Sequence, residues 1–289
     1  MSRFGVLLWR RIFESGDRKH LVKQQKPALQ KAFGIQGIHF AFRAAGLISI
    51  MLANNEIGTI EPIQRLAEIA HRHRVMFHTD AVQAVGHIPL SVEALGVDML
   101  SASAHKFGGP KGIGFLYVRE GTPLAPLHHG GGQESGRRAG TENAAAIIAM
   151  ATALTESCAS LESFRYRMST LEQIILQKLD AHSIDYRRNG GQMSLPGLLS
   201  LSFRGVDGER LMHRLDLAGI SVSTGSACNS KETEVSHVLK AIHLADEYAK
   251  GTIRISLGDD NREDDARDIA EALLRICADL ANGIASQSS

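Results

Sequence analysis

The chain has 289 residues, of which 44% are hydrophobic and 22% charged, so it can bury a sizeable core and has the length of about two domains. Its 32 lysines and arginines balance 31 aspartates and glutamates, and the formal charge of +1 gives no attraction to nucleic acid or an anionic membrane. No apolar run reaches the roughly 18 residues that span a bilayer. We therefore expect a cytoplasmic protein whose partner is a small molecule.

Residues 1–46 form an atypical N-terminal segment. They carry basic clusters and scattered aromatic side chains without a sustained period, so no element is assigned to them. The FGVLLW stretch is too short for a signal peptide, and Arg10 and Arg11 lie on the wrong side of it.

Residues 47–118 alternate between strand-like apolar runs and helical patterns. The strand-like runs are LISIML, VMFHTD, VDMLSASA and GIGFLYV, and the helix between the first two has an apolar face formed by Ile63, Leu66, Ile69, Ala70 and His73. This alternation predicts an α/β fold with a mainly parallel sheet. We expect residues 47–150 to form a large domain around that sheet.

A long helix is predicted over residues 141–161, with Thr141 as its N-cap. Its apolar stripe consists of Ile147, Ile148, Ala151, Leu154, Cys158 and Leu161. Beyond it, the short strands LLSLSF, ISVS and TIRISL lie among helical patterns. Residues 151–289 are therefore expected to form a smaller α+β domain.

The three cysteines have neither metal-site spacing nor a disulfide framework. Cys158 and Cys277 lie on apolar helical stripes and are expected to fill the core. Cys228 lies in STGSACNS, a loop-like run of small hydroxyl residues, where it is either a nucleophile or an inert thiol. No histidine pair has metal-site partners at a suitable spacing, so no metal site is expected.

Polar residues follow two predicted strands at the ends where open α/β sheets bind ligands. Asp80 closes VMFHTD and is either a ligand or a helix N-cap, while Ser103, His105 and Lys106 follow the next strand. GGPKGIG returns to a strand and does not fit a P-loop. Lys106 is therefore either a solvated turn lysine or a lysine that binds a cofactor covalently. The Gly-rich run HHGGGQESGRRAGTEN is either a phosphate site or a flexible basic loop.

Six segments together resemble a known family. ANNEIGTIEP, FHTDAVQAVG, SASAHKFGGPKGIG, GGGQESGRRAGTEN, STGSACNS and GTIRISLG occur in an order and spacing similar to those of the NifS/IscS-like cysteine desulfurases, which are pyridoxal-phosphate-dependent enzymes of the class V aminotransferase group. The resemblance begins at about Leu47 and runs almost to the C-terminus. It implies an α/β fold of the fold-type I transferases and a homodimer.

The resemblance also implies a cofactor site. Lys106 would bind pyridoxal 5'-phosphate covalently and act in catalysis, and Asp80 would pair with the protonated ring nitrogen. Gln83 would bind the phenolic oxygen. Ser103 and His105 would bind the phosphate, and His105 is also placed among the catalytic residues.

The remaining implied roles concern the substrate and the second subunit. Thr141 would reach the phosphate of the neighbouring subunit. Asn55 and Arg254 would hold the carboxylate of L-cysteine, with Asn55 also near the cofactor. Cys228 would attack the sulfur, giving L-alanine and a Cys228 persulfide for an iron–sulfur scaffold, a tRNA-modifying enzyme or another acceptor.

One departure from the family keeps other functions open. Family members carry a longer segment ahead of the NNEIG-type motif, with a phosphate-binding loop and a histidine that stacks on the cofactor, and neither occurs in residues 1–46. The alternatives are an inactive or cofactor-poor truncated remnant, and another class V aminotransferase or lyase.

Overall fold

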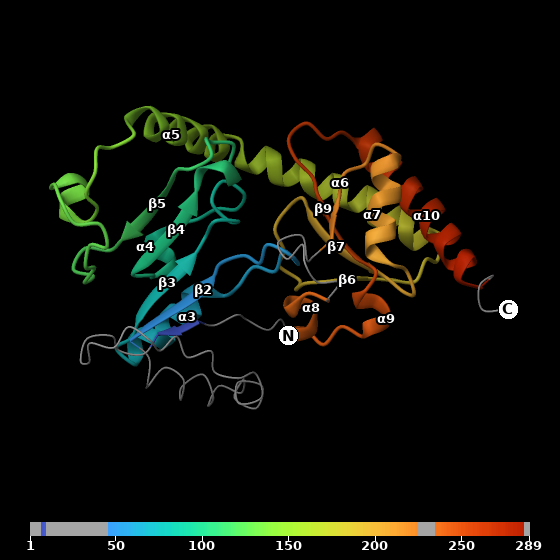
Figure 1. Ribbon diagram of the computed structural model, residues 1–289, viewed down its shortest axis with the longest axis horizontal. Helices are drawn as coiled ribbons and strands as arrows, with labels where there is room; N and C mark the ends of the chain where they lie inside the picture. Colours follow the sequence, from blue (N-terminus) through green and yellow to red (C-terminus); the bar gives the residue numbers. More distant parts are fainter. Residues whose placement is uncertain (1–6, 10–45, 225–234, 286–289) are drawn as a thin grey trace. The chain divides into compact units, whose positions relative to one another are not determined.

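The computed structural model describes residues 7–9, 46–224 and 235–285 (Figure 1). These residues form two compact units. The N-terminal unit contains the described residues among Phe4–Ala53 and Glu61–Ser160, and the C-terminal unit contains those among Asn54–Ile60 and Leu161–Ser289. The short stretch Asn54–Ile60 thus belongs with residues far along the chain, while the domains 47–150 and 151–289 stay a prediction.

The N-terminal unit contains a five-stranded sheet (Figure 1). Its order is β1 (Leu7–Trp9), β2 (Leu47–Met51), β3 (Met76–Asp80), β4 (Met99–Ser103) and β5 (Gly114–Val118). The three central strands are parallel, and each edge strand pairs antiparallel with its neighbour. The predicted α/β fold and its parallel core are confirmed, and β1 is a strand in the segment that the sequence left unassigned.

The two faces of this sheet differ in burial. Helix α3 (Ile63–Arg72) connects β2 to β3 and packs against β3, and α4 (Val92–Leu95) connects β3 to β4. Along β2 and β3 the burial alternates, as expected when one face is covered and the other is not. The covered face includes Ile48, Ile50, Phe77, Thr79 and Leu100. The opposite, half-exposed face carries Ser49, His78 and Asp80.

Helix α5 (Ala144–Ala159) differs from the predicted helix in two ways. Its N-cap is Asn143, whose side chain accepts a hydrogen bond from the Ala146 N–H at 3.2 Å, so the assignment of Thr141 as the cap was wrong. None of its residues is buried, and Cys158 is exposed, so the expected core stripe was also wrong. The helix contacts the sheet layer near its C-terminal end, where Ser157 Oγ donates to the Phe107 carbonyl at 3.0 Å.

The C-terminal unit is an antiparallel sheet with helices packed against it (Figure 1). The sheet order is β6 (Tyr186–Arg188), β7 (Leu198–Phe203), β9 (Thr252–Ser256) and β8 (Ser223–Thr224). The core also includes buried residues of α6 (Leu161–Ala181), α7 (Gly208–Leu217) and α10 (Glu263–Ala285). Short helices α8 (His237–Ala241) and α9 (Asp246–Ala249) precede β9. Cys277, 3% exposed, is part of this core, which confirms its prediction.

Among the described residues, no single helix is long and apolar enough to cross a bilayer. Helices α5 and α6 taken together meet the test by length and composition alone.

Candidate functional site

Asp80 and Ser103 end two neighbouring strands of the five-stranded sheet. Strands β3 and β4 run parallel, with Asp80 opposite Ser101, so their carboxyl ends lie at one edge. The Val82 N–H donates to Asp80 Oδ1 at 2.9 Å, which fixes the carboxyl group over the turn that follows β3. Among the described residues, Oδ2 has no hydrogen-bond partner, so one carboxylate oxygen is available to a ligand.

His105 and Lys106 follow β4 in the single-turn helix η1 (Ala104–Lys106). His105 Nδ1 lies 2.8 Å from Ser103 Oγ, so these two polar groups form a pair at the strand end. Lys106 is half-buried, and its Nζ makes no hydrogen bond or ion pair with the part of the chain that the structure describes. An amine that forms no such hydrogen bond or ion pair can react with an aldehyde cofactor. Gln83, also half-buried, lies in the turn after β3.

The glycines after Lys106 allow β5 to approach β4. A Cβ at Gly114 would lie 2.3 Å from the Ala102 carbonyl oxygen, and one at Gly109 would lie 2.9 Å from Ala104 Cβ. Both clashes are with β4 or the turn that follows it. The glycine-rich run therefore forms a tight connection between β4 and β5. It is not a P-loop, as the sequence predicted.

Thr141 is exposed and precedes α5. The structure does not bring it into the group formed by Asp80, Ser103 and Lys106 through any hydrogen bond of the described residues. Its predicted role, which concerns a second subunit, stays a prediction.

Asn55 and Arg254 meet in the C-terminal unit. Arg254 lies on β9, and its Nη1 donates to the backbone carbonyl of Asn55 at 3.0 Å. Its Nε is buried and has no hydrogen-bond partner among the described residues. Arg254 is half-buried, and its unused N–H makes the guanidinium suited to a carboxylate, because a bidentate partner would satisfy that N–H.

The loop that carries Asn55 is shaped by the preceding residue, Asn54. Its Oδ1 accepts hydrogen bonds from the N–H groups of Glu56 at 2.8 Å and Ile57 at 3.0 Å. Ser236 donates a short hydrogen bond to the Glu56 carboxylate. The sequence predicted a role for Asn55 only, although an Asn followed by a Gly-containing turn is a signal for such side chain–backbone bonding.

Two ionisable groups near the predicted site, one buried and one half-buried, were not predicted from the sequence. Burial raises the pKa of Glu61 to about 8, and its Oε2 has no hydrogen-bond partner among the described residues. His78 is half-buried on β3, and burial lowers its pKa while the neighbouring Asp80 acts in the opposite direction. The alternation of VMFHTD was the available signal for His78, because it puts His78 and Asp80 on one face.

Cys228, the predicted nucleophile, lies in residues 225–234, outside the described part of the chain. Strand β8 ends at Thr224, just before them. Within the described residues, no group of three or more His, Cys, Asp or Glu side chains could hold a metal ion.

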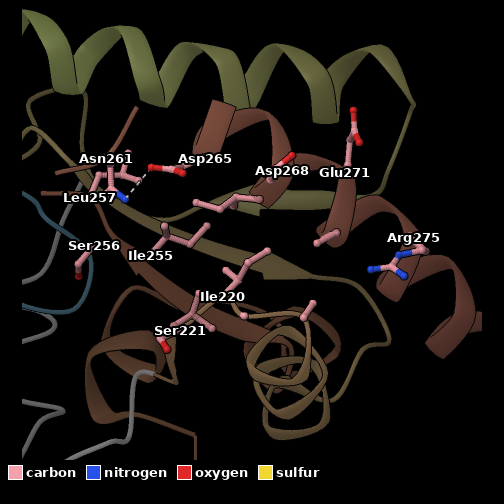
Figure 2. A pocket seen from close by; sticks show the side chains of 15 residues that line it. Ile220, Ser221, Ile255, Ser256, Leu257, Asn261, Asp265, Asp268, Glu271 and Arg275 are labelled. Carbon is pink, nitrogen blue, oxygen red and sulfur yellow. Dashed lines mark hydrogen bonds between the residues drawn. The ribbon is translucent and has the colours of Figure 1, made fainter. Parts of the chain in front are cut away.

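A cleft of about 760 Å³ lies elsewhere in the C-terminal unit (Figure 2). It is bordered by Ile220 and Ser221 ahead of β8, by Ile255 on β9, and by carboxylates of α10 that include Asp265 and Asp268. Asp265 accepts a hydrogen bond from the Arg262 N–H at 2.9 Å, at the start of α10. None of the predicted site residues within the described ranges lines this cleft.

Comparisons with known proteins agree with the resemblance. The family model described as "Aminotransferase class-V" matches residues 39–269. "Cysteine desulfurase IscS" of Dictyoglomus turgidum is 49% identical over 235 residues, which are 81% of this chain and 60% of that protein. "Cysteine desulfurase IscS" of Clostridium botulinum is 44% identical over 233 residues, 80% of this chain and 59% of that protein.

Solved structures are similar as well. One described as "NIFS-LIKE PROTEIN" has a TM-score of 0.71 and 39% identity, covering 81% of this chain and 61% of that one. "SspA in complex with cysteine" has a TM-score of 0.62 and 35% identity, covering 80% of this chain and 62% of that one. The chain thus spans about three-fifths of the length of the relatives it matches.

Proposed function

The chain belongs to the class-V aminotransferase family and has the α/β fold of the fold-type I pyridoxal-phosphate transferases; on that premise, we propose that it acts as a cysteine desulfurase. The observation that carries the proposal is the arrangement at the sheet edge. The amine of Lys106 has no partner among the described residues, the Ser103–His105 pair lies beside it in the chain, and Asp80 ends the adjacent strand. The curated relatives named cysteine desulfurase support the choice of reaction.

The residues at the sheet edge suit pyridoxal 5'-phosphate. Lys106 would bind its aldehyde, and the free oxygen of Asp80 would hold the ring nitrogen in its protonated form. Ser103 and His105 supply hydrogen-bond donors for the phosphate, and Gln83 supplies one for the phenolic oxygen. When bound, the cofactor withdraws electrons from the substrate and so weakens the bonds at its α- and β-carbons.

Different residues of the chain would then bind L-cysteine, transfer protons and attack its sulfur. Arg254 and Asn55 bind the α-carboxylate, and Lys106 carries protons to and from the substrate carbon skeleton. Cys228 attacks the substrate sulfur, so that the C–S bond breaks and an S–S bond forms. The carbon takes a proton in place of sulfur, which yields L-alanine and a persulfide on Cys228. Both sulfur atoms are then in the persulfide, and the carbon skeleton of the substrate leaves as L-alanine.

The proposal includes a homodimer and a sulfur acceptor. The exposed helix α5 offers apolar surface to a second subunit, since Ile148 is 67% exposed and no residue of α5 is buried. Thr141 precedes this helix and would contribute to the neighbour's phosphate site. The acceptor class is a scaffold of iron–sulfur cluster assembly or a tRNA-modifying enzyme. A cytoplasmic location also stays a prediction.

Reconstitution with pyridoxal phosphate tests the cofactor assignment. The purified chain is expected to become yellow. Treatment with sodium borohydride should then leave the cofactor permanently attached to Lys106. Lys106→Ala should lose the yellow absorbance and the attached cofactor, whereas Lys111→Ala, which changes an exposed lysine five residues away, should keep both. A chain that folds but stays colourless would favour the cofactor-poor remnant.

Turnover of L-cysteine tests the reaction. We expect sulfide in the presence of a reductant and an equal amount of L-alanine, with both lost in Cys228→Ser. Asp80→Asn should bind the cofactor and lose most of its turnover, because a neutral amide does not hold the ring nitrogen protonated. Desulfuration that survives Cys228→Ser would refute the persulfide, and transamination without sulfide would identify another class V activity.

A further inference from the structure

A row of three polar side chains crosses the centre of the five-stranded sheet. Ser49 Oγ on β2 lies 2.7 Å from His78 Nδ1, and Ser101 Oγ on β4 lies 3.1 Å from His78 Nε2. Both edges of the imidazole are therefore bonded, one to each neighbouring strand. Three parallel strands are tied together by side chains as well as by their backbones.

The row lies on the face of the sheet that carries Asp80. His78 and Asp80 are two residues apart on β3, so their side chains leave the strand on the same side. Ser101 is directly opposite Asp80 in the β3–β4 register, and the Ala81 N–H donates to the Ser101 carbonyl at 2.9 Å. Ser101, which bonds one edge of the His78 ring, thus also flanks the strand end from which Asp80 projects.

The partners of the ring are compatible with an uncharged imidazole. A neutral imidazole has one N–H donor and one acceptor nitrogen, and a serine hydroxyl can serve either role. Neither ring nitrogen is bonded to a carboxylate of the described part of the chain, and a carboxylate partner would favour the cation. Burial also lowers the pKa of His78 and outweighs the nearby charge of Asp80.

We propose that His78 is a positioning residue for Asp80. Its uncharged ring is fixed between Ser49 and Ser101 and holds the strand end. The Asp80 carboxylate then pairs with the cofactor's ring nitrogen and not with a cation at position 78. The inference rests on the proposed function. A cation at this position would repel a protonated ring nitrogen and would compete with it for Asp80.

The test compares two probes, pyridoxal phosphate and its deaza analogue, in which carbon replaces the ring nitrogen. The ratio of their dissociation constants, measured by fluorescence titration, isolates the contribution of the ring nitrogen from that of the phosphate and aldehyde. The wild-type chain should prefer pyridoxal phosphate. His78→Lys should lower that preference by about tenfold, since it adds a nearby positive charge. His78→Gln, which is neutral, should stay close to the wild-type ratio.

Asp80→Asn distinguishes failure of the inference from failure of the proposed function. If the wild-type chain binds neither probe, or binds both equally, the cofactor assignment itself is wrong. If the preference disappears in Asp80→Asn but persists in His78→Lys, the cofactor assignment stands and the role of His78 is refuted.

A second measurement uses the protein without cofactor. Carbon and nitrogen chemical shifts of the imidazole, recorded by NMR against pH, should show that the His78 ring is still neutral at pH values below the usual pKa range of histidine. Ser101→Ala should loosen the ring and lower the preference for pyridoxal phosphate, which a merely structural hydroxyl would not do. A charged His78 at neutral pH, or an unchanged preference in Ser101→Ala, would overturn the inference even if His78→Lys does not fold.

Discussion

Cys158 and Cys277 occupy similar apolar stripes in the sequence but different environments in the protein. Cys277 is 3% exposed in the C-terminal core, and burial raises the pKa of its thiol to about 12. Cys158 lies exposed near the end of α5. Helical periodicity predicts that a face is apolar, but it does not say whether another element covers that face.

Thiol labelling should separate these two cysteines. In the folded chain, an alkylating reagent is expected to modify Cys158 and to spare Cys277, because only an accessible thiolate reacts. Mass spectrometry of digested protein locates the label, and addition of denaturant should make Cys277 reactive. Labelling of Cys277 in the native protein would contradict its burial. Persulfide assays on Cys228 are best made in a Cys158→Ser background, which removes this competing thiol.

Glu61 is a residue whose burial predicts a dependence of stability on pH. Its pKa is raised from 4.5 to about 8 in the folded chain, so the unfolded chain loses the proton first as the pH rises. Stability is therefore lost progressively between these two values, and the full penalty is present above the higher one. Below the lower value both states are protonated, and the group has no effect.

Glu61→Gln should remove this penalty. The melting temperatures of the variant and the wild-type chain are expected to be similar at about pH 5, and the variant should melt several degrees higher at about pH 9. Glu68→Gln, at an exposed position of α3, controls for the loss of a carboxylate. A difference between Glu61→Gln and wild type that does not change with pH would show that the buried carboxyl does not titrate in this range.

At the scale of elements, the connection between β4 and β5 decides where Lys106 stands. The single-turn helix η1 follows β4 directly, and β5 returns so closely that Gly114 faces the Ala102 carbonyl. Because β5 pairs with β4, both ends of the turn between them are fixed. The lysine is thereby held at the strand end even though its side chain makes no polar contact with the described residues.

Gly114→Ala should disturb this connection. The added Cβ would meet a backbone oxygen at 2.3 Å, so β5 must move away from β4, and we expect a loss of about 1 to 3 kcal/mol in unfolding free energy. Gly132→Ala is the matched control, since a Cβ there meets nothing within 4 Å and its φ is −84°. Denaturant unfolding measures both variants. Equal stabilities would show that the strands tolerate the wider spacing.

At the scale of the whole molecule, the exposed apolar surface of the N-terminal unit requires an explanation. Leu127 is 85% exposed and Ile148 is 67% exposed, although both are large apolar side chains. Contiguous apolar surface commonly marks an interface, and the homodimer proposal assigns that role to α5, which carries Ile148. Under the proposed function, a second copy of the chain covers it.

Ile148→Asp tests this homodimer. If α5 lies in the interface, the buried charge should convert dimer into monomer, as measured by light scattering after size-exclusion chromatography. Leu217→Asp, at a position that is 88% exposed on α7, should leave the oligomeric state unchanged. A wild-type chain that is monomeric at micromolar concentration would refute the homodimer directly, and an Ile148→Asp dimer would place its interface elsewhere.

The sequence by itself determined the elements with strong periodicity. The parallel strands around VMFHTD and VDMLSASA and the buried stripes of α6 and α10 were predictable, because alternation and 3.6-residue spacing are local properties. The order of six motifs indicated the family. Asp80 and Ser103 were predictable as neighbours for a related reason, since parallel strands bring their carboxyl ends to one edge.

Only the tertiary structure decided which apolar faces are covered and which polar groups meet. Thr141 and Asn143 are both capping residues by type, and α5 begins after Asn143 because its side chain, not that of Thr141, reaches a free N–H of the first turn. The Arg254–Asn55 contact joins residues 199 positions apart, and His78 finds serines on two other strands. Such pairings follow from packing between distant segments, which no local pattern in the chain encodes.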